Sequence, residues 1–148
     1  MNPTLDVTLA RKTLAAQPFS ALLGARLTAF GGGEATLELD IREELLQQHG
    51  TLHGGVLGYA ADNALSFAAG SVAGPGLLAA GLTIDFLRPA RGAVLRARAQ
   101  VVRAGRTRVV CRCDLSTVDG DGGETLCAVA QGSLAVVEGL AGAGRPSG

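Results

Sequence analysis

One segment, residues 54–69, limits the folds open to this chain more than any other. It is rich in Ala and Leu and contains no Pro, so it predicts one buried helix of about four turns. Gly, Ser and Pro in residues 70–76 predict where that helix ends. The segments around it have the two-residue period of strands. A lone apolar helix among strands must bury its surface against the sheet that those strands form.

Six segments are predicted to be strands, and four of them, residues 34–41, 77–87, 93–103 and 107–118, alternate apolar and polar side chains. Three consecutive glycines, residues 31–33, predict the hairpin turn between the first two strands. Consecutive strands joined by short turns predict an antiparallel sheet, and therefore an α+β domain. The predicted strands are residues 25–30, 34–41, 77–87, 93–103, 107–118 and 124–137.

The remaining parts of the chain are the two ends. Residues 8–16 and 18–23 each predict a short helix. We therefore expect an N-terminal helical segment over residues 1–24, one domain over residues 25–138, and a flexible tail over residues 139–148, in which Gly and Ala predominate.

Composition disfavours several classes of function. The formal net charge is zero, aromatic residues are 3% and Trp is absent, so nucleic acid is not an expected partner. The start of the chain lacks the pattern of a secretory signal, and no run approaches the roughly 20 apolar residues of a membrane helix. We expect a cytoplasmic protein with no membrane partner.

The three cysteines are an odd number and do not suggest a disulfide framework. Cys111 and Cys113 are either a redox or metal pair or two inward-facing residues of a strand, and the alternating pattern around them favours the second interpretation.

Asp62 is the anomalous residue of the predicted helix, because its neighbours are apolar and a buried carboxylate is costly unless it is paired. It is either a structural group with a partner at an interface or a catalytic group. Positions three and four apart share a helix face, so Asp62 and Ser66 extend a stripe of small and polar residues that begins at Gly55. Such a stripe can line a narrow pocket beside a carboxylate.

The glycines after His53 open the helix. The first N–H groups of a helix have no partner inside it, so Gly54 and Gly55 can stabilise an oxyanion on a docked carbonyl. Asp62 lies about 12 Å further along the axis at 1.5 Å per residue. One chain's glycines therefore do not reach its own Asp62, and the antiparallel helix of a two-fold partner would bring them together. This predicts active sites at a homodimer interface.

Three features in this order resemble one known family. The chain resembles hotdog acyl-CoA thioesterases of the phenylacetate-degradation (PaaI) type, within the 4-hydroxybenzoyl-CoA thioesterase superfamily. The features that carry the resemblance are His53-Gly54-Gly55, then Asp62, then residues 82–89 with their Phe-Leu-Arg-Pro ending. The resemblance covers about residues 20–137. It implies a curved antiparallel sheet wrapped around one long helix, and hydrolysis of an aryl-acyl or medium-chain acyl-CoA to the free acid and CoA. No cofactor is implied, since coenzyme A is part of the substrate.

The resemblance also implies roles for individual residues. Asp62 would be the general base or the nucleophile, and the amides of Gly54 and Gly55 would polarise the thioester. Gln47 falls where such enzymes carry Asn or Gln near the thioester or the attacking water, and Ser66 falls where some relatives hold that water. The chain would assemble as a dimer or a dimer of dimers.

Two histidines suggest a competing idea. His49 and His53 are four residues apart, as in some zinc sites, but no acid lies between them and no third ligand follows, so we predict no metal. His53 is expected to shape the loop before the helix, with acid–base catalysis as the alternative.

Eight arginines lie between residues 88 and 112 with no acid among them. They are either a solvated face of the sheet or a surface for the phosphates of CoA. Arg88 and Arg106, beside a strand end and a turn, are the candidates for phosphate binding.

Two rival functions stay open: a non-catalytic module that binds acyl-CoA, and a hydratase of the same fold. Hydratase chemistry favours a His paired with the acid, and no His follows Asp62.

Overall fold

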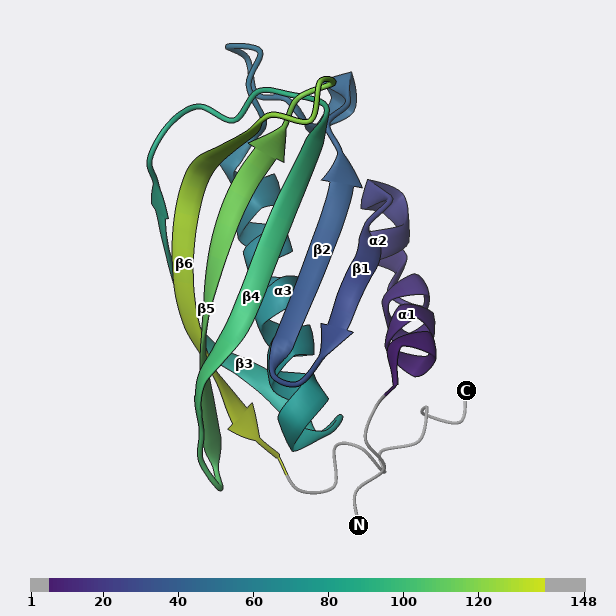
Figure 1. The fold of residues 1–148 in the computed structure, drawn as a ribbon, viewed down its shortest axis with the longest axis vertical. Coiled ribbons are helices and arrows are strands. Elements are labelled where there is room, and N and C mark those ends of the chain that lie inside the picture. Colours follow the sequence, from purple (N-terminus) through teal and green to yellow (C-terminus); the bar gives the residue numbers. More distant parts are fainter. Residues whose placement is uncertain (1–5, 138–148) are drawn as a thin grey trace.

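The computed structural model describes residues 6–137, and in it a curved sheet wraps around the long helix α3 (Figure 1). The predicted tail, and residues 1–5 of the predicted N-terminal segment, lie outside the described residues. The helices are α1 (Val7–Ala15), α2 (Pro18–Leu23), the 3-10 helix η1 (Glu43–Leu45) and α3 (Gly54–Ala73). The strands are β1 (Arg26–Gly31), β2 (Glu34–Asp40), β3 (Leu77–Phe86), β4 (Val94–Ala104), β5 (Arg108–Val118) and β6 (Glu124–Val136).

The strands form one sheet in the order β1-β2-β4-β5-β6-β3, and all five neighbouring pairs are antiparallel. This confirms the predicted α+β hotdog architecture. The glycines at 31–33 form the β1–β2 turn, with φ values of 137°, 62° and 85° that side chains rarely tolerate. The strand order was not evident from the sequence: β3 does not pair with β4, which follows it, but lies at the sheet edge beside β6.

The core lies between α3 and the inner face of the sheet. Leu37, Leu39, Leu95 and Leu115 point inward from β2, β4 and β5 and are at most 1% exposed. Burying a side chain of this size stabilises the fold by about 1.5–3 kcal/mol. On its opposite side the same helix keeps an outward face that the sheet does not cover.

The cysteines belong to this core, which confirms that Cys111 and Cys113 are inward-facing strand residues. Cys111, Cys113 and Cys127 are buried free thiols. Burial raises the pKa of Cys111 to about 11 and that of Cys113 to about 12, so both stay protonated and unreactive near neutral pH.

Helix α3 is longer than predicted. The helix ends within residues 70–76 as predicted, but at Ala73 and not at residue 69, because Gly70 lies buried inside it; Gly74, with φ 81°, is the C-cap. The extra turn contacts the β1–β2 turn, where the Gly33 N–H donates to the Ser71 hydroxyl over 2.8 Å. None of the helices within residues 6–137 is long and apolar enough to cross a membrane.

The outer face of the sheet carries ion pairs. Glu124 contacts Arg98 and Arg96, and Arg96 also contacts Glu38 at 3.4 Å. The hydrogen bond that Arg98 donates to the Glu124 carboxylate lowers the pKa of Glu124. Two of the eight arginines are thus engaged by acids that are distant in the sequence.

Strands β6 and β3 and helix α3 lie in close contact at Gly132. A Cβ atom at Gly132 would lie 2.8 Å from the Gly81 carbonyl oxygen and 3.0 Å from Leu65 Cδ1. We expect Gly132→Ala to lower the free energy of unfolding by about 1–3 kcal/mol, because overpacking forces these groups apart. Urea denaturation measures the change. Gln131→Ala, on the exposed outer face of the same strand, is the control and should leave stability nearly unchanged; equal stability of all three proteins would contradict the prediction.

Candidate active site

His53 caps the start of α3. Its Nδ1 accepts a hydrogen bond from the Gly55 N–H over 2.8 Å. His53 therefore caps the helix, and the Gly55 amide is occupied within the chain. The neighbouring Gly54 N–H donates no hydrogen bond to any residue between 6 and 137. Of the two amides proposed to polarise a substrate, the structure leaves that of Gly54 free.

A side chain at position 54 would crowd this amide. The ring of Phe86, at the end of β3, lies 3.2 Å from the point where a Cβ atom of Gly54 would stand. Glycine at this position therefore keeps the space beside the free N–H open between α3 and β3.

The side chain of Gln47 is held at both ends of its amide. Nε2 donates to the Thr51 hydroxyl, and Oε1 accepts from the His49 N–H, both over 2.5 Å. A primary amide has two N–H donors, so one remains for a substrate or a water. Thr51, which is buried and holds the Gln47 side chain, was not identified from the sequence. The available signal was that Thr51 follows Gln47 by four residues in the same polar loop.

Three of the predicted site residues share one groove of about 430 Å³. Gln47, Gly54 and Arg88 line it together with Phe86 and Leu87. Arg88 is held in place because its guanidinium donates to the Leu126 carbonyl. The groove thus combines a fixed amide, a free backbone N–H and a guanidinium.

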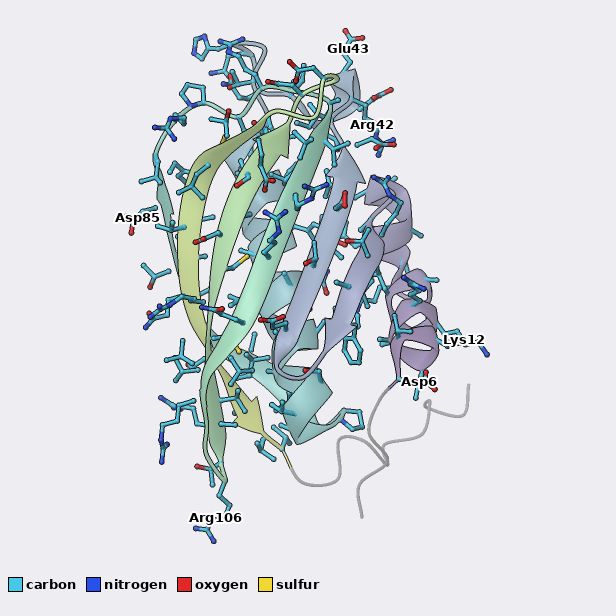
Figure 2. The ribbon with its side chains drawn as sticks, viewed as in Figure 1. Asp6, Lys12, Arg42, Glu43, Asp85 and Arg106 are labelled. Carbon is cyan, nitrogen blue, oxygen red and sulfur yellow. The ribbon has the colours of Figure 1, made fainter. Side chains whose placement is uncertain are left out.

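Arg106 does not join this groove. Figure 2 shows it at the tip of the β4–β5 hairpin, at the opposite end of the molecule from Arg42 and Glu43. Those two residues come just before the loop that leads to α3. Within a single chain, the two arginines proposed for phosphate binding are therefore far apart.

Asp62 lies near the middle of α3, on the face turned away from the sheet, and its side chain is exposed in the single chain. The sheet of the same chain therefore does not desolvate it, contrary to the idea of an acid buried in an apolar helix. Partial burial still raises the pKa of Asp62. Within residues 6–137, no hydrogen bond or ion pair engages its carboxylate. The Ser66 hydroxyl donates instead to the Asp62 backbone carbonyl over 2.8 Å.

Metal-ligating side chains do not gather near these groups. Among the described residues, no three His, Cys, Asp or Glu side chains lie together in a way that could hold a metal ion.

Comparison with known proteins assigns the family. The family model of the Thioesterase superfamily matches residues 49–124, slightly more than half of the chain. The chain belongs to the thioesterase superfamily. The matched residues of this thioesterase include the His53-Gly54-Gly55 motif and Asp62, so the resemblance seen in the sequence is confirmed at the level of the family.

Individual relatives agree with this assignment. The acyl-coenzyme A thioesterase PaaI of Escherichia coli is 36% identical over 57% of this chain and 60% of its own. A solved thioesterase family protein from Silicibacter pomeroyi has a TM-score of 0.81 and 34% identity, over 85% of this chain and 93% of that chain. The solved PaaI protein from the E. coli phenylacetic acid degradation operon has a TM-score of 0.75 and 25% identity, over 89% and 96% of the two chains.

The cap at His53 gives a test that separates its structural role from acid–base catalysis. We expect His53→Ala to lower the free energy of unfolding by about 0.5–2 kcal/mol, because the Gly55 N–H loses its acceptor. His53→Asn keeps a short side-chain acceptor and should recover most of the stability and the activity. Chemical denaturation and thioester hydrolysis measure both. Stability recovered by Asn without activity would instead identify His53 as a proton carrier.

Proposed function

We propose that this thioesterase hydrolyses acyl-CoA to a free acid and CoA, at sites built from two chains. The carboxylate of Asp62 acts as general base or nucleophile, and the Gly54 amide polarises the thioester carbonyl. As a general base, Asp62 takes a proton from water while the water oxygen bonds to the acyl carbon. The carbon–sulfur bond then breaks, and the departing CoA sulfur takes the proton that Asp62 accepted, so the free acid and the CoA thiol form and the carboxylate is restored. Coenzyme A belongs to the substrate, so no separate cofactor takes part.

The observation that carries this proposal is an exposed, unpaired carboxylate with a raised pKa on the same helix as a free backbone donor. A raised pKa makes a carboxylate a better proton acceptor near neutral pH. The two groups are about eight helical residues, or 12 Å, apart in one chain, so they do not act on one bond without a partner.

The two edges of the sheet indicate how a partner binds. Helix α1 lies beside the β1 edge, where Arg11 Nε donates to the Leu27 carbonyl over 2.9 Å. The β3 edge has no neighbouring strand within the described residues, and it exposes large apolar side chains. An exposed apolar edge strand is a template for pairing with another strand. These side chains are Leu78, Leu82, Phe86 and Leu87, each 41–57% exposed.

Contacts along β3 within one chain support one register of pairing, which would complete the site. Phe86 lies against Gly54, whereas Leu82 and Leu65 both approach Gly132. If two β3 strands pair antiparallel with Leu82 opposite the partner's Phe86, the partner's Gly54 comes beside the turn of α3 that contains Asp62. The same two-fold axis exchanges the ends of the molecule and carries Arg106 of one chain toward the Arg88 end of the other. We propose this dimer, alone or within a dimer of dimers, as the active form. A cytoplasmic location stays a prediction.

The role of Asp62 is tested by its isosteric amide. We expect Asp62→Asn to retain fold and assembly but to lose about 10²–10⁴-fold in turnover, because the amide accepts no proton. Thiol release from acyl-CoA measures turnover, and circular dichroism with size-exclusion chromatography checks the fold and assembly. In the wild type, kcat/KM should fall as the pH decreases through the raised pKa of Asp62, since the protonated acid cannot act. Near-normal turnover of the variant would favour a binding module or another mechanism.

The shared site is tested with a second variant, Gly54→Pro. Proline deletes the free N–H, is favoured in the first turn of a helix, and follows His53, whose ψ of 133° suits a residue before proline. Gly54→Ala is the matched control, because it keeps the N–H and adds a Cβ atom against the same Phe86 ring. We expect about 10²–10³-fold lower kcat for Pro relative to Ala.

Mixing the inactive variants then shows whether the site spans two chains. A heterodimer of Asp62→Asn and Gly54→Pro contains one intact site, so co-refolded mixtures should regain about a quarter of wild-type activity. No recovery, with heterodimers demonstrated by mass spectrometry, would show that both groups serve the same chain's site.

A further inference from the structure

A second groove, of about 160 Å³, runs between α1 and the outward face of α3. Its lining is mostly apolar, with Ser66 and Asn63 at the end near Asp62 and with Leu77 of β3 at the far end. We call it the α1–α3 groove. Its lining includes Thr13, Asn63, Ser66, Phe67, Gly70 and Leu77.

The position of the groove relates it to the thioester site. Ser66 and Asp62 are one turn apart on the same face of α3, and the Ser66 hydroxyl is bonded to the Asp62 carbonyl. Side chains four residues apart on a helix lie about 5–6 Å from each other. An acyl group whose carbonyl carbon stands at the Asp62 carboxylate therefore reaches this groove after the first few carbons.

The segment that follows α1, including Gln17 of the groove lining, is attached to α3. Ser20 is 2% exposed and accepts a hydrogen bond from the Tyr59 hydroxyl over 2.6 Å, while it donates to Gln17 over 2.6 Å. Phe19 packs edge-on against Tyr59, with ring centroids 5.3 Å apart. These contacts join α2 and the residue before it to α3, so the groove is a formed feature of the fold.

The shape of the groove favours one class of acyl group. From Asn63 to Gly70 it follows α3 for about 10 Å at 1.5 Å per residue. An apolar cavity of about 150 Å³ holds a molecule of benzene size, which has six carbons. The same volume spread along two helical turns fits a linear chain better than a compact ring, and Gly70 contributes no side chain that would interrupt it.

We propose that the α1–α3 groove binds the acyl group of the substrate, and that this group is a linear chain with about six carbons beyond the reach of Asp62. The inference rests on the proposed acyl-CoA hydrolysis and assigns its substrate class. It makes α1 the element that determines acyl specificity, with Thr13 as the side chain that limits the width of the groove.

The test compares Thr13→Trp, which fills the groove, with Lys12→Trp at the preceding residue. The Lys12 side chain points away from the body of the protein (Figure 2). Butyryl-, hexanoyl-, octanoyl- and phenylacetyl-CoA are the probes. In the wild type, kcat/KM should rise about threefold to fourfold per methylene beyond butyryl-CoA, as expected for apolar burial. Thr13→Trp should lower octanoyl-CoA turnover by about tenfold or more and leave butyryl-CoA unchanged, whereas Lys12→Trp should leave both unchanged.

Binding gives a second readout that does not depend on turnover. Calorimetry on Asp62→Asn, with and without Thr13→Trp, measures the dissociation constants of the same thioesters. Affinity should rise with chain length in Asp62→Asn, and Thr13→Trp should weaken the binding of octanoyl-CoA but not that of butyryl-CoA. If no thioester is hydrolysed but affinity still rises with chain length and falls with Thr13→Trp, the groove is upheld and the proposed hydrolysis is wrong. A profile that does not depend on length, equal losses on all four thioesters, or a preference for phenylacetyl-CoA would overturn the assignment of the groove.

Discussion

The packing of α3 against the inner face of the sheet is the interaction on which the rest of the structure depends. Leu57, Leu65 and the alanines of its buried face lie against the inward side chains of the sheet. A helix covered by one sheet keeps one face uncovered, and Asp62 lies on that face. The chain can therefore fold without paying the large cost of burying an unpaired carboxylate. In the proposed dimer, the partner chain and the substrate would desolvate Asp62 further, which would couple its basicity to assembly.

At the start of α3, one backbone N–H is bonded within the chain and its neighbour is free. A helix start leaves several N–H groups without partners, and water or side chains usually occupy them. Here the His53 imidazole takes the Gly55 N–H, which fixes the direction of the first turn. The Gly54 N–H stays free beside the Phe86 ring, where Gly54 lines the groove of about 430 Å³. Because its neighbour is fixed, this donor is oriented before a carbonyl arrives, and preorganised donors of this kind are the effective ones in catalysis.

Local sequence patterns predicted the elements but not the contacts between distant ones. Alternation of apolar side chains located four of the six strands, and the glycines at 31–33 located a hairpin, because both signals are local. The end of α3 was predicted too early because Gly70, which often ends a helix, is here a buried small residue of its interior. The arginine-rich segment seemed free of acids, yet Glu38 and Glu124 come from 58 and 28 residues away to contact Arg96. The exposure of Asp62 was missed because the apolar neighbours occupy the opposite face of the helix.

In the proposed reaction, the two grooves separate recognition of the acyl group from activation of the thioester. The α1–α3 groove begins one turn after Asp62 of the same chain, whereas the groove of Gln47, Gly54 and Arg88 lies at the start of the helix. In a two-fold dimer, one chain then supplies the carboxylate and the acyl pocket, and its partner supplies the carbonyl donor and a guanidinium for CoA. Substitutions in α1 can change the preferred acyl group without touching the donors at Gly54. The common part of every acyl-CoA, its thioester and CoA, would be recognised by the partner whatever the acyl chain.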